Sequence, residues 1–170
     1  MEKKTIFEWL SLSDELLWTF TEWSACKASG PGGQKVNKTS SAIQLTFPPL
    51  NLSVKSQKHR GQQDNKKSAL CTLKKHISFL ADPPIPDFAL QVTRPYFQNG
   101  LHIQEHNSIL PNVYAVLCAR FLENQGEHKC IANAQGISTS CLIRFLSENK
   151  TLLERVNQIR QNFGKHPLHG

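Results

Sequence analysis

The chain has 170 residues, of which 39% are hydrophobic, enough to form the core of one ordinary domain or two small ones. No stretch approaches the roughly 20 apolar residues of a membrane helix, and the N-terminus has no apolar signal-peptide core, so we expect a cytoplasmic protein without membrane association.

Five cysteines without a CxxC pair indicate neither a disulfide framework nor a zinc ribbon. We therefore expect reduced thiols, no metal and no cofactor. The one cluster with metal-ligand chemistry matches no common zinc spacing, and comprises Cys118, His128, Cys130 and Cys141.

Positive charge is concentrated in one segment. The formal net charge is +7, and between Lys27 and Lys75 ten basic residues stand against one acid, Asp64. A solvated protein surface normally mixes both signs, whereas a focused basic segment is the electrostatic footprint of a polyphosphate partner. This distribution favours a nucleic acid as the partner.

The expected elements begin with strands. Residues 18–23, WTFTEW, alternate aromatic and polar side chains, which predicts a half-buried strand. Residues 42–47 and 50–55 alternate in the same way. Pro48 and Pro49 separate these two runs and cannot continue a central ladder, so the pattern predicts a hairpin.

A helix is predicted over 64–81, with Asp64 as its candidate cap and lysines on the faces away from the core. Its apolar residues recur at helical spacing: Leu70, Leu73, Ile77 and Leu80. Three or four strands with one packed helix make a small α+β domain, which we place at 1–82.

The rest of the chain is predicted to be helical. Four of the nine prolines fall within 81–100, so we interpret 83–111 as a Pro-containing connection. In the domain expected at 112–170, apolar residues follow Asn112 and Asn149 at helical spacing, and Gly164 is placed to end the last helix. Between these helices, IANAQGISTSCLIRFL has the spacing of a helix-turn-helix, which ordinary helix packing also produces.

The stretch SGPGGQ, residues 29–34, is too punctuated for the interior of a helix or strand. It matches neither a P-loop nor a dinucleotide fingerprint, and the chain has no GxSxG nucleophile motif. Gly32 and Gly33 permit unusual backbone angles and close approach to a substrate, while Gln34 supplies a main-chain N–H and a side-chain amide. Such a donor can stabilise an oxyanion. From glycine content alone, a simple flexible loop is the alternative.

The longer stretch SGPGGQKVNKTSSAIQL resembles the GGQ motif of the class I peptide-chain release factor family, including the stand-alone members that rescue stalled ribosomes. The segment SVKSQKHRGQQDNKKSALCTL is similar to the basic strand-to-helix continuation in that family. The resemblance covers approximately residues 14–80. It implies ribosome-dependent hydrolysis of the ester that joins a nascent peptide to tRNA, in the peptidyl-transferase centre of the large ribosomal subunit.

The resemblance also implies roles for individual residues. The main-chain N–H of Gln34 would stabilise the developing oxyanion and the departing hydroxyl, its side chain would orient water, and Gly32 and Gly33 would supply the backbone conformation. Family glutamines are often methylated, which makes Gln34 a candidate substrate of a glutamine methyltransferase. Contacts to ribosomal RNA are expected from Lys27, Ser29, Lys35, Asn37, Lys38, Thr39, Arg60, Lys66 and Lys67.

Three functions stay open at this level. A chain of 170 residues has no room for the additional domains that read stop codons, so we expect codon-independent peptidyl-tRNA hydrolysis in ribosome rescue. The basic segment is also compatible with a ribosome- or RNA-binding module that lacks catalysis. The third alternative, a helix-turn-helix DNA-binding protein, depends on IANAQGISTSCLIRFL alone.

Overall fold

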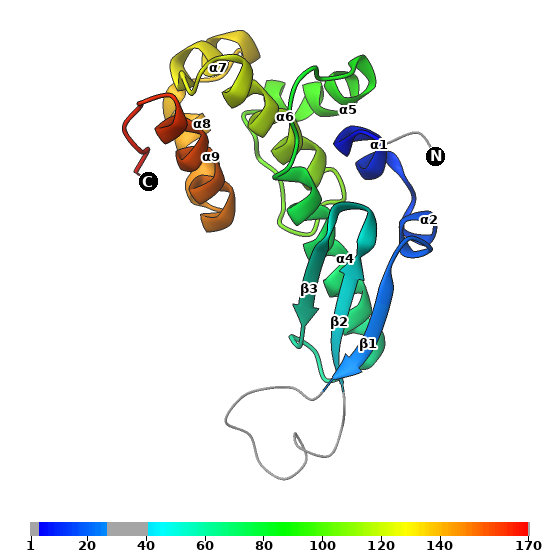
Figure 1. Ribbon diagram of the computed structural model, residues 1–170. Coiled ribbons are helices and arrows are strands. Elements are labelled where there is room, and N and C mark those ends of the chain that lie inside the picture. The colour runs from blue at the N-terminus through cyan, green and yellow to red at the C-terminus, as the bar shows by residue number, and fades with distance from the viewer. Residues whose placement is uncertain (1–3, 27–40, 170) are drawn as a thin grey trace. The chain divides into compact units, whose positions relative to one another are not determined.

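The computed structural model describes residues 4–26 and 41–169 (Figure 1). The chain forms two compact units. The sheet unit is Ser11–Ile77, and the helical unit combines Met1–Leu10 with Ser78–Gly170. Among the described residues, no helix has the length and apolar character needed to cross a membrane.

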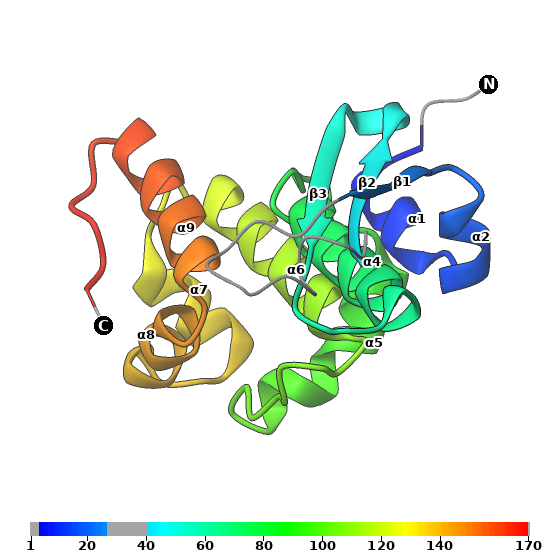
Figure 2. The same ribbon diagram turned by 90° about the horizontal axis from the view of Figure 1, so that it is seen from below.

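The sheet unit contains a three-stranded antiparallel sheet of order β1-β2-β3, with helix α4 packed on it (Figures 1 and 2). The strands are β1 (Glu22–Cys26), β2 (Ala42–Phe47) and β3 (Leu52–Ser56), and the helix is α4 (Gln62–Ser78). Alternation along β2 explains the packing, because Ile43, Leu45 and Phe47 are fully buried while Gln44, between them, is exposed. The helix meets this face with four buried side chains: Ala69, Leu70, Leu73 and Ile77.

The predicted hairpin is confirmed. β2 and β3 pair antiparallel, with Phe47 opposite Leu52. The prolines start a short 3-10 turn, Pro48–Leu50, and Asn51 closes it in the left-handed conformation with φ 51°. Asparagine is one of the few residues that adopt this conformation readily.

The strand predicted at 18–23 is wrong. Helix α2 (Asp14–Trp18) occupies its beginning, and β1 starts only at Glu22. The Ser13 hydroxyl caps α2 by accepting a hydrogen bond from the Leu16 N–H at 3.2 Å, and acidic residues fill the first turn. This N-terminal capping stabilises a helix where the aromatic alternation alone indicates a strand.

The helical unit is built around α6 (Leu110–Glu123), which packs against α5 (Asp87–Gln98), α7 (His128–Gln135) and α9 (Lys150–Asn162). Most of the α6 side chains are buried, so this helix forms the centre of the core. Helix α8 (Thr139–Ser147) packs on α7 and α9. The short helix α1 (Ile6–Ser11) begins with a reciprocal cap, in which Thr5 Oγ1 accepts from the Glu8 N–H at 3.2 Å and the Thr5 N–H donates to Glu8 Oε2 at 2.6 Å.

Two predictions for this region need correction. The connection predicted at 83–111 contains α5, whose N-cap is Pro86 and which carries Pro95 in its interior. The helix predicted to start at Asn112 begins two residues earlier, at Leu110. The end of the chain agrees with expectation, because the Asn149 side chain caps α9 through the Leu152 N–H at 2.9 Å and Gly164 follows the helix with φ 68°. The α+β fold class is confirmed.

Candidate nucleic-acid interface

The glycine-rich segment joins two neighbouring strands at one end of the sheet. Cys26, the last residue of β1, is the cross-strand partner of Ala42, the first residue of β2. The segment between them therefore leaves and re-enters the sheet at adjacent points. The predicted catalytic residues and most predicted RNA contacts lie in it, outside the described residues: Gly32, Gly33, Gln34, Lys27, Ser29, Lys35, Asn37, Lys38 and Thr39.

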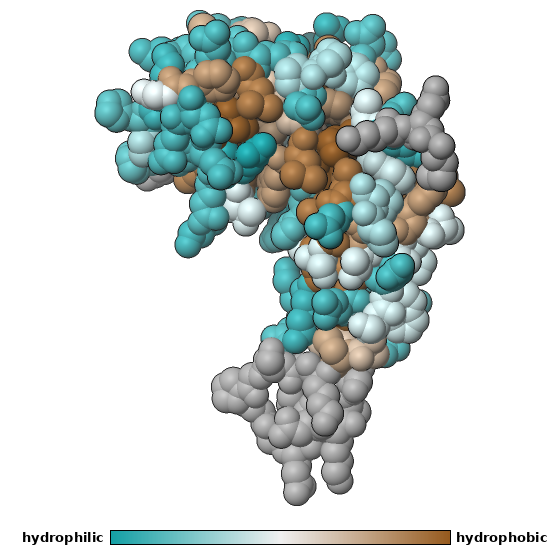
Figure 3. Space-filling model, in the orientation of Figure 1, coloured by the Kyte–Doolittle hydropathy of each residue, from teal (hydrophilic) through white to brown (hydrophobic). Residues whose placement is uncertain are grey.

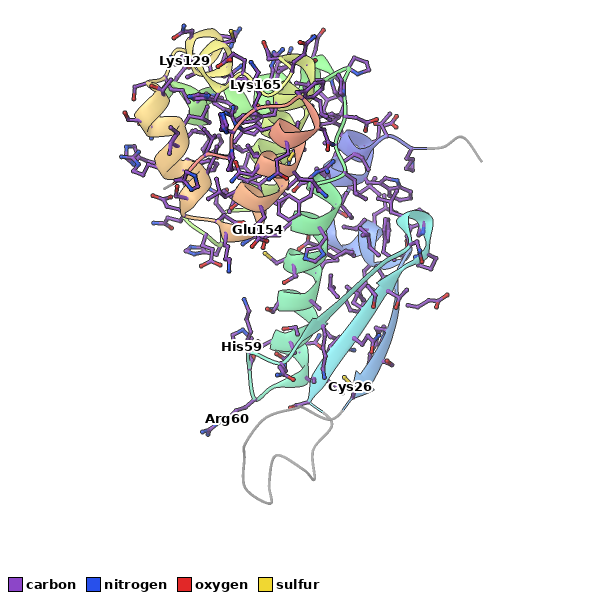
Figure 4. The ribbon with its side chains drawn as sticks, turned by 60° about the vertical axis from the view of Figure 1, so that its left-hand side comes forward. Cys26, His59, Arg60, Lys129, Glu154 and Lys165 are labelled. Atoms are coloured by element: carbon purple, nitrogen blue, oxygen red, sulfur yellow. The ribbon has the colours of Figure 1, made fainter. Side chains whose placement is uncertain are left out.

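A basic turn lies at the same end of the sheet. β3 ends at Ser56, next to Ile43 near the start of β2, and residues 57–61 then lead into α4. Figure 4 shows His59 and Arg60 on this turn, with Arg60 pointing into solvent, and Cys26 at the nearby end of β1. The register of the sheet thus brings the turn to the end where the glycine-rich segment is attached.

The turn is fixed by a buried asparagine that the sequence analysis did not single out. Asn65, in the first turns of α4, has no exposed surface. Its Nδ2 donates to the carbonyls of Ser41 at 2.8 Å and His59 at 2.7 Å. Its Oδ1 accepts from the His59 N–H at 2.9 Å and from the Ser56 hydroxyl at 3.4 Å. One side chain therefore connects the start of β2, the end of β3, the turn and α4.

The turn and the adjacent helix present positive charge to solvent. Lys58, Arg60 and Lys67 are exposed and have no ion-pair partner among the residues that the structure describes. Unpaired exposed cations are available to phosphate groups, since no internal partner must first be displaced. Of the predicted RNA contacts, Arg60 and Lys67 belong to this set.

Lys66 is placed differently. Its Nζ lies 3.4 Å from the centre of the Trp23 ring, and its side chain is half-buried against the edge of the sheet. This cation–π contact helps to attach α4 to β1. Lys74 is also engaged inside the unit, because it forms an ion pair with Asp14. Basic residues close in sequence thus have different environments.

Helices α7 and α8 do not carry a comparable basic surface. Gly136, with φ 68°, and Ser138, whose hydroxyl caps α8 through the Cys141 N–H at 3.1 Å, form the turn between them. Figure 3 shows both hydrophilic and hydrophobic side chains over α7, and charges of both signs occur at this pair of helices. Lys129 and Arg144 are accompanied by Glu127 and Glu148 at the helix ends. Mixed charge of this kind is typical of an ordinary protein surface.

The four residues with metal-ligand chemistry do not share one environment: Cys118, His128, Cys130 and Cys141. Burial raises the pKa of the Cys118 thiol to about 12, whereas Cys130 is exposed. Within residues 4–26 and 41–169, no group of three or more His, Cys, Asp or Glu side chains could hold a metal ion.

Comparison with known proteins finds similarity in the part of the chain that contains most of the sheet unit. The family model described as the RF-1 domain matches residues 17–83. Peptide chain release factor 2 of Campylobacter hominis is 47% identical over 51 residues, and peptide chain release factor 1 of Blochmanniella floridana is 49% identical over 51 residues. Each match covers 30% of this chain and 14% of the relative. For peptide chain release factor 1 of Phytoplasma australiense the identity is 40% over 60 residues, or 35% of this chain and 17% of that protein.

Proposed function

We propose that the chain, through its residues 17–83, belongs to the GGQ-domain family of class I peptide chain release factors and that it hydrolyses peptidyl-tRNA on the ribosome. The observation that carries this proposal is the presence of SGPGGQ inside the matched segment, between the paired strand ends at Cys26 and Ala42. The exposed cations beside those strand ends supply a surface for ribosomal RNA.

The chemistry assigned to the segment needs only a donor and a water molecule from the protein side. Water attacks the carbonyl carbon of the peptidyl ester, the bond to the tRNA ribose oxygen breaks, and the proton of the water goes to the departing hydroxyl. The main-chain N–H of Gln34 donates to the oxyanion that develops on the carbonyl oxygen. Its side chain orients the attacking water, and Gly32 and Gly33 allow the backbone to approach the ester. Ribosomal RNA of the large subunit and the tRNA form the rest of the site.

We further propose that hydrolysis is independent of a stop codon and serves stalled ribosomes. Support comes from the second unit of the chain, in which α5 to α9 have a core of their own. In this proposal, the helical unit directs the RF-1 domain to its ribosome, and Gln34 is the substrate of a glutamine methyltransferase. Mass spectrometry of the protein from its native host tests the modification, which adds one methyl group to the peptide containing Gln34.

Peptide release from ribosomes stalled on an mRNA without a stop codon tests the activity. Gln34→Pro removes the N–H, and we expect a decrease in release rate of about 10²–10³-fold or more. Gln34→Ala retains the N–H but loses the amide that orients water, so its rate should lie between those of Gln34→Pro and the wild type. Gln44→Ala, an exposed glutamine on β2, is the matched control and should release at the wild-type rate. Equal release by the wild type and both Gln34 variants would refute the mechanism.

A non-catalytic RNA-binding module is the second candidate, favoured by the exposed cations Lys58, Arg60 and Lys67. Ribosome binding as a function of salt distinguishes the two candidates. Loss of two phosphate contacts in the double variant Arg60→Ala/Lys67→Ala should reduce the slope of log K against log salt by about 1 to 2. If ribosome binding by the wild type and the double variant differs in slope by this amount but the wild type releases no peptide, the chain is better described as a non-catalytic RNA-binding module.

A further inference from the structure

The helical unit contains a polar cleft that the proposed peptidyl-tRNA chemistry does not use. It has a volume of about 580 Å³ and is lined by residues of α5, α6 and α7, of which α6 packs on the other two. Helix α5 contributes Arg94 and Gln98, α6 contributes Arg120, and the end of α7 contributes Asn133 and Gln135. Pockets for small ligands have volumes of about 300–1,000 Å³, so this cleft is large enough to hold a ligand of the size of a mononucleotide.

Two arginines give the cleft positive charge. Arg94 is exposed and forms no hydrogen bond or ion pair with the part of the chain that the structure describes. Arg120 donates from Nη1 to Glu123 Oε2 at 2.8 Å, while its buried Nε has no partner among the described residues. The Glu123 carboxylate thus balances the charge of Arg120, whereas no described carboxylate balances that of Arg94. Guanidinium groups pair with phosphate or carboxylate through two parallel hydrogen bonds.

The end of α7, which also lines the cleft, offers acceptors. The last helical turn of α7 leaves the carbonyls of Ala134 and Gln135 without a hydrogen bond to any described residue, since the capping N–H groups of Gly136 and Ile137 go to Asn133 and Ala132. The amide side chains of Asn133, Gln135 and Gln98 can both donate and accept. A wall of this kind suits the edge of a nucleobase, which has donors and acceptors side by side.

Because the cleft combines arginines with the amides and carbonyls at the end of α7, it favours some anionic ligands over others. A carboxylate of an acidic side chain would use the arginines but would bring no donor–acceptor edge to the amides and carbonyls at the end of α7. A nucleotide uses the arginines and the end of α7 together, and the half-buried apolar side chain of Leu90 at the cleft can contact its base. We propose that this cleft binds a 5′-nucleotide unit, with the phosphate on Arg94 and Arg120 and the base against the amides and carbonyls at the end of α7.

The unit could be a free nucleotide or part of an RNA strand, and calorimetric titration of the full chain distinguishes these sources. The probes are the four nucleoside 5′-monophosphates, the corresponding nucleosides and a short single-stranded RNA. Arg94→Ala should weaken nucleotide binding about tenfold to a hundredfold, the expected loss for a hydrogen-bonded charge pair. Lys150→Ala is the matched control, because this exposed lysine on α9 also loses one positive charge but lies outside the cleft. It should bind like the wild type.

The RNA titration is made in the Arg60→Ala/Lys67→Ala background, so that the basic surface of the sheet unit contributes little to binding. Binding of a monophosphate that depends on Arg94 and on the phosphate supports a free nucleotide; binding of RNA alone that depends on Arg94 supports a strand. The proposal is overturned if neither probe binds the wild type, or if Arg94→Ala and Lys150→Ala bind equally well. Because no ribosome is present, the result is independent of whether the chain hydrolyses peptidyl-tRNA.

Discussion

The bridge made by Asn65 gives the sharpest test of how the sheet unit holds its basic turn. Asn65→Ala removes a fully buried side chain that makes three hydrogen bonds of 2.7 to 2.9 Å and a weaker one of 3.4 Å. The substitution leaves the Ser41 carbonyl and both backbone groups of His59 without these partners. We expect the turn and the start of β2 to lose their fixed separation.

The loss of unfolding free energy in Asn65→Ala depends on how exposed the former hydrogen-bond partners of Asn65 are. A buried polar group without a partner costs about 1–3 kcal/mol. The backbone groups of His59 lie on an exposed turn and can bind water instead, whereas Ser41 is half-buried and recovers less. Adding the void left by the side chain, we expect the sheet unit to lose about 2–4 kcal/mol of its unfolding free energy.

Amide hydrogen exchange measures this loss within one unit, which matters because two compact units need not unfold together. In Asn65→Ala, the His59 N–H loses its acceptor and should exchange at close to the unprotected rate, while the paired amides of β2 and β3 should exchange faster by the factor that corresponds to the lost free energy. Asn157→Ala is a matched control in the helical unit, where Asn157 accepts from the Leu168 N–H at 2.7 Å and donates to the Leu168 carbonyl at 3.0 Å. It should release Leu168 and leave His59 protected.

The reasoning is refuted if Asn65→Ala leaves both the exchange of His59 and the stability of the sheet unit unchanged. A further consequence depends on the proposed peptidyl-tRNA hydrolysis. Because Ser41 stands at the return of the glycine-rich segment to the sheet, Asn65→Ala should also slow peptide release, by up to about 10²-fold if the reacting groups shift by an ångström.

Three other predictions concern single side chains. Lys66→Met should lower the unfolding free energy of the sheet unit by about 0.5–1 kcal/mol through loss of the contact with Trp23, which urea titration followed by tryptophan fluorescence would detect. A thiol reagent should modify the exposed Cys71 in the native protein but reach Cys118, whose pKa burial raises to about 12, only after unfolding; mass spectrometry of the labelled peptides would show this order. Burial, followed by the charge of Arg160, lowers the pKa of His128 in the folded state. The unfolded chain therefore binds a proton on His128 more readily than the folded chain does. The contribution of neutral His128 to stability is present above the ordinary histidine pKa of about 6.5 and is lost as the pH falls through that value toward the lower pKa of the folded state. Thermal unfolding across this window should depend less on pH in His128→Gln than in the wild type.

Local patterns in the sequence predicted much of this fold. The alternation along 42–47, the two prolines after it and the Asn149 cap act over a few residues, and each was confirmed. The error at 18–23 arose because a serine cap and the aromatic alternation compete in the same short stretch. Helix α5 was missed because prolines are strong breakers, although a proline at the N-cap costs a helix little.

The bridge by Asn65 could not be predicted in the same way, since it joins Ser41, Ser56, His59 and α4 through the tertiary fold. One signal was present. Asn65 precedes Ala69, Leu73 and Ile77 at intervals of four, so a polar residue occupies the buried stripe of the helix. A buried amide must find partners, and the polypeptide nearest to the start of α4 is the turn that leads into it.

The placement of charge in the sheet unit follows from the same bridge. Exposed cations such as Arg60 repel one another and gain nothing from the fold itself, so a turn that carries them needs to be held by other groups. Asn65 supplies those bonds from the buried side, which leaves the outer side of the turn free for phosphates. In the helical unit, the Arg160 guanidinium instead donates hydrogen bonds to the carbonyls of Gly126 and His166, which stabilises the fold. The end of the sheet thus carries exposed cations on a turn that other groups hold, and for this reason we propose the contact with RNA phosphates there rather than on the mixed-charge surface of α7 and α8.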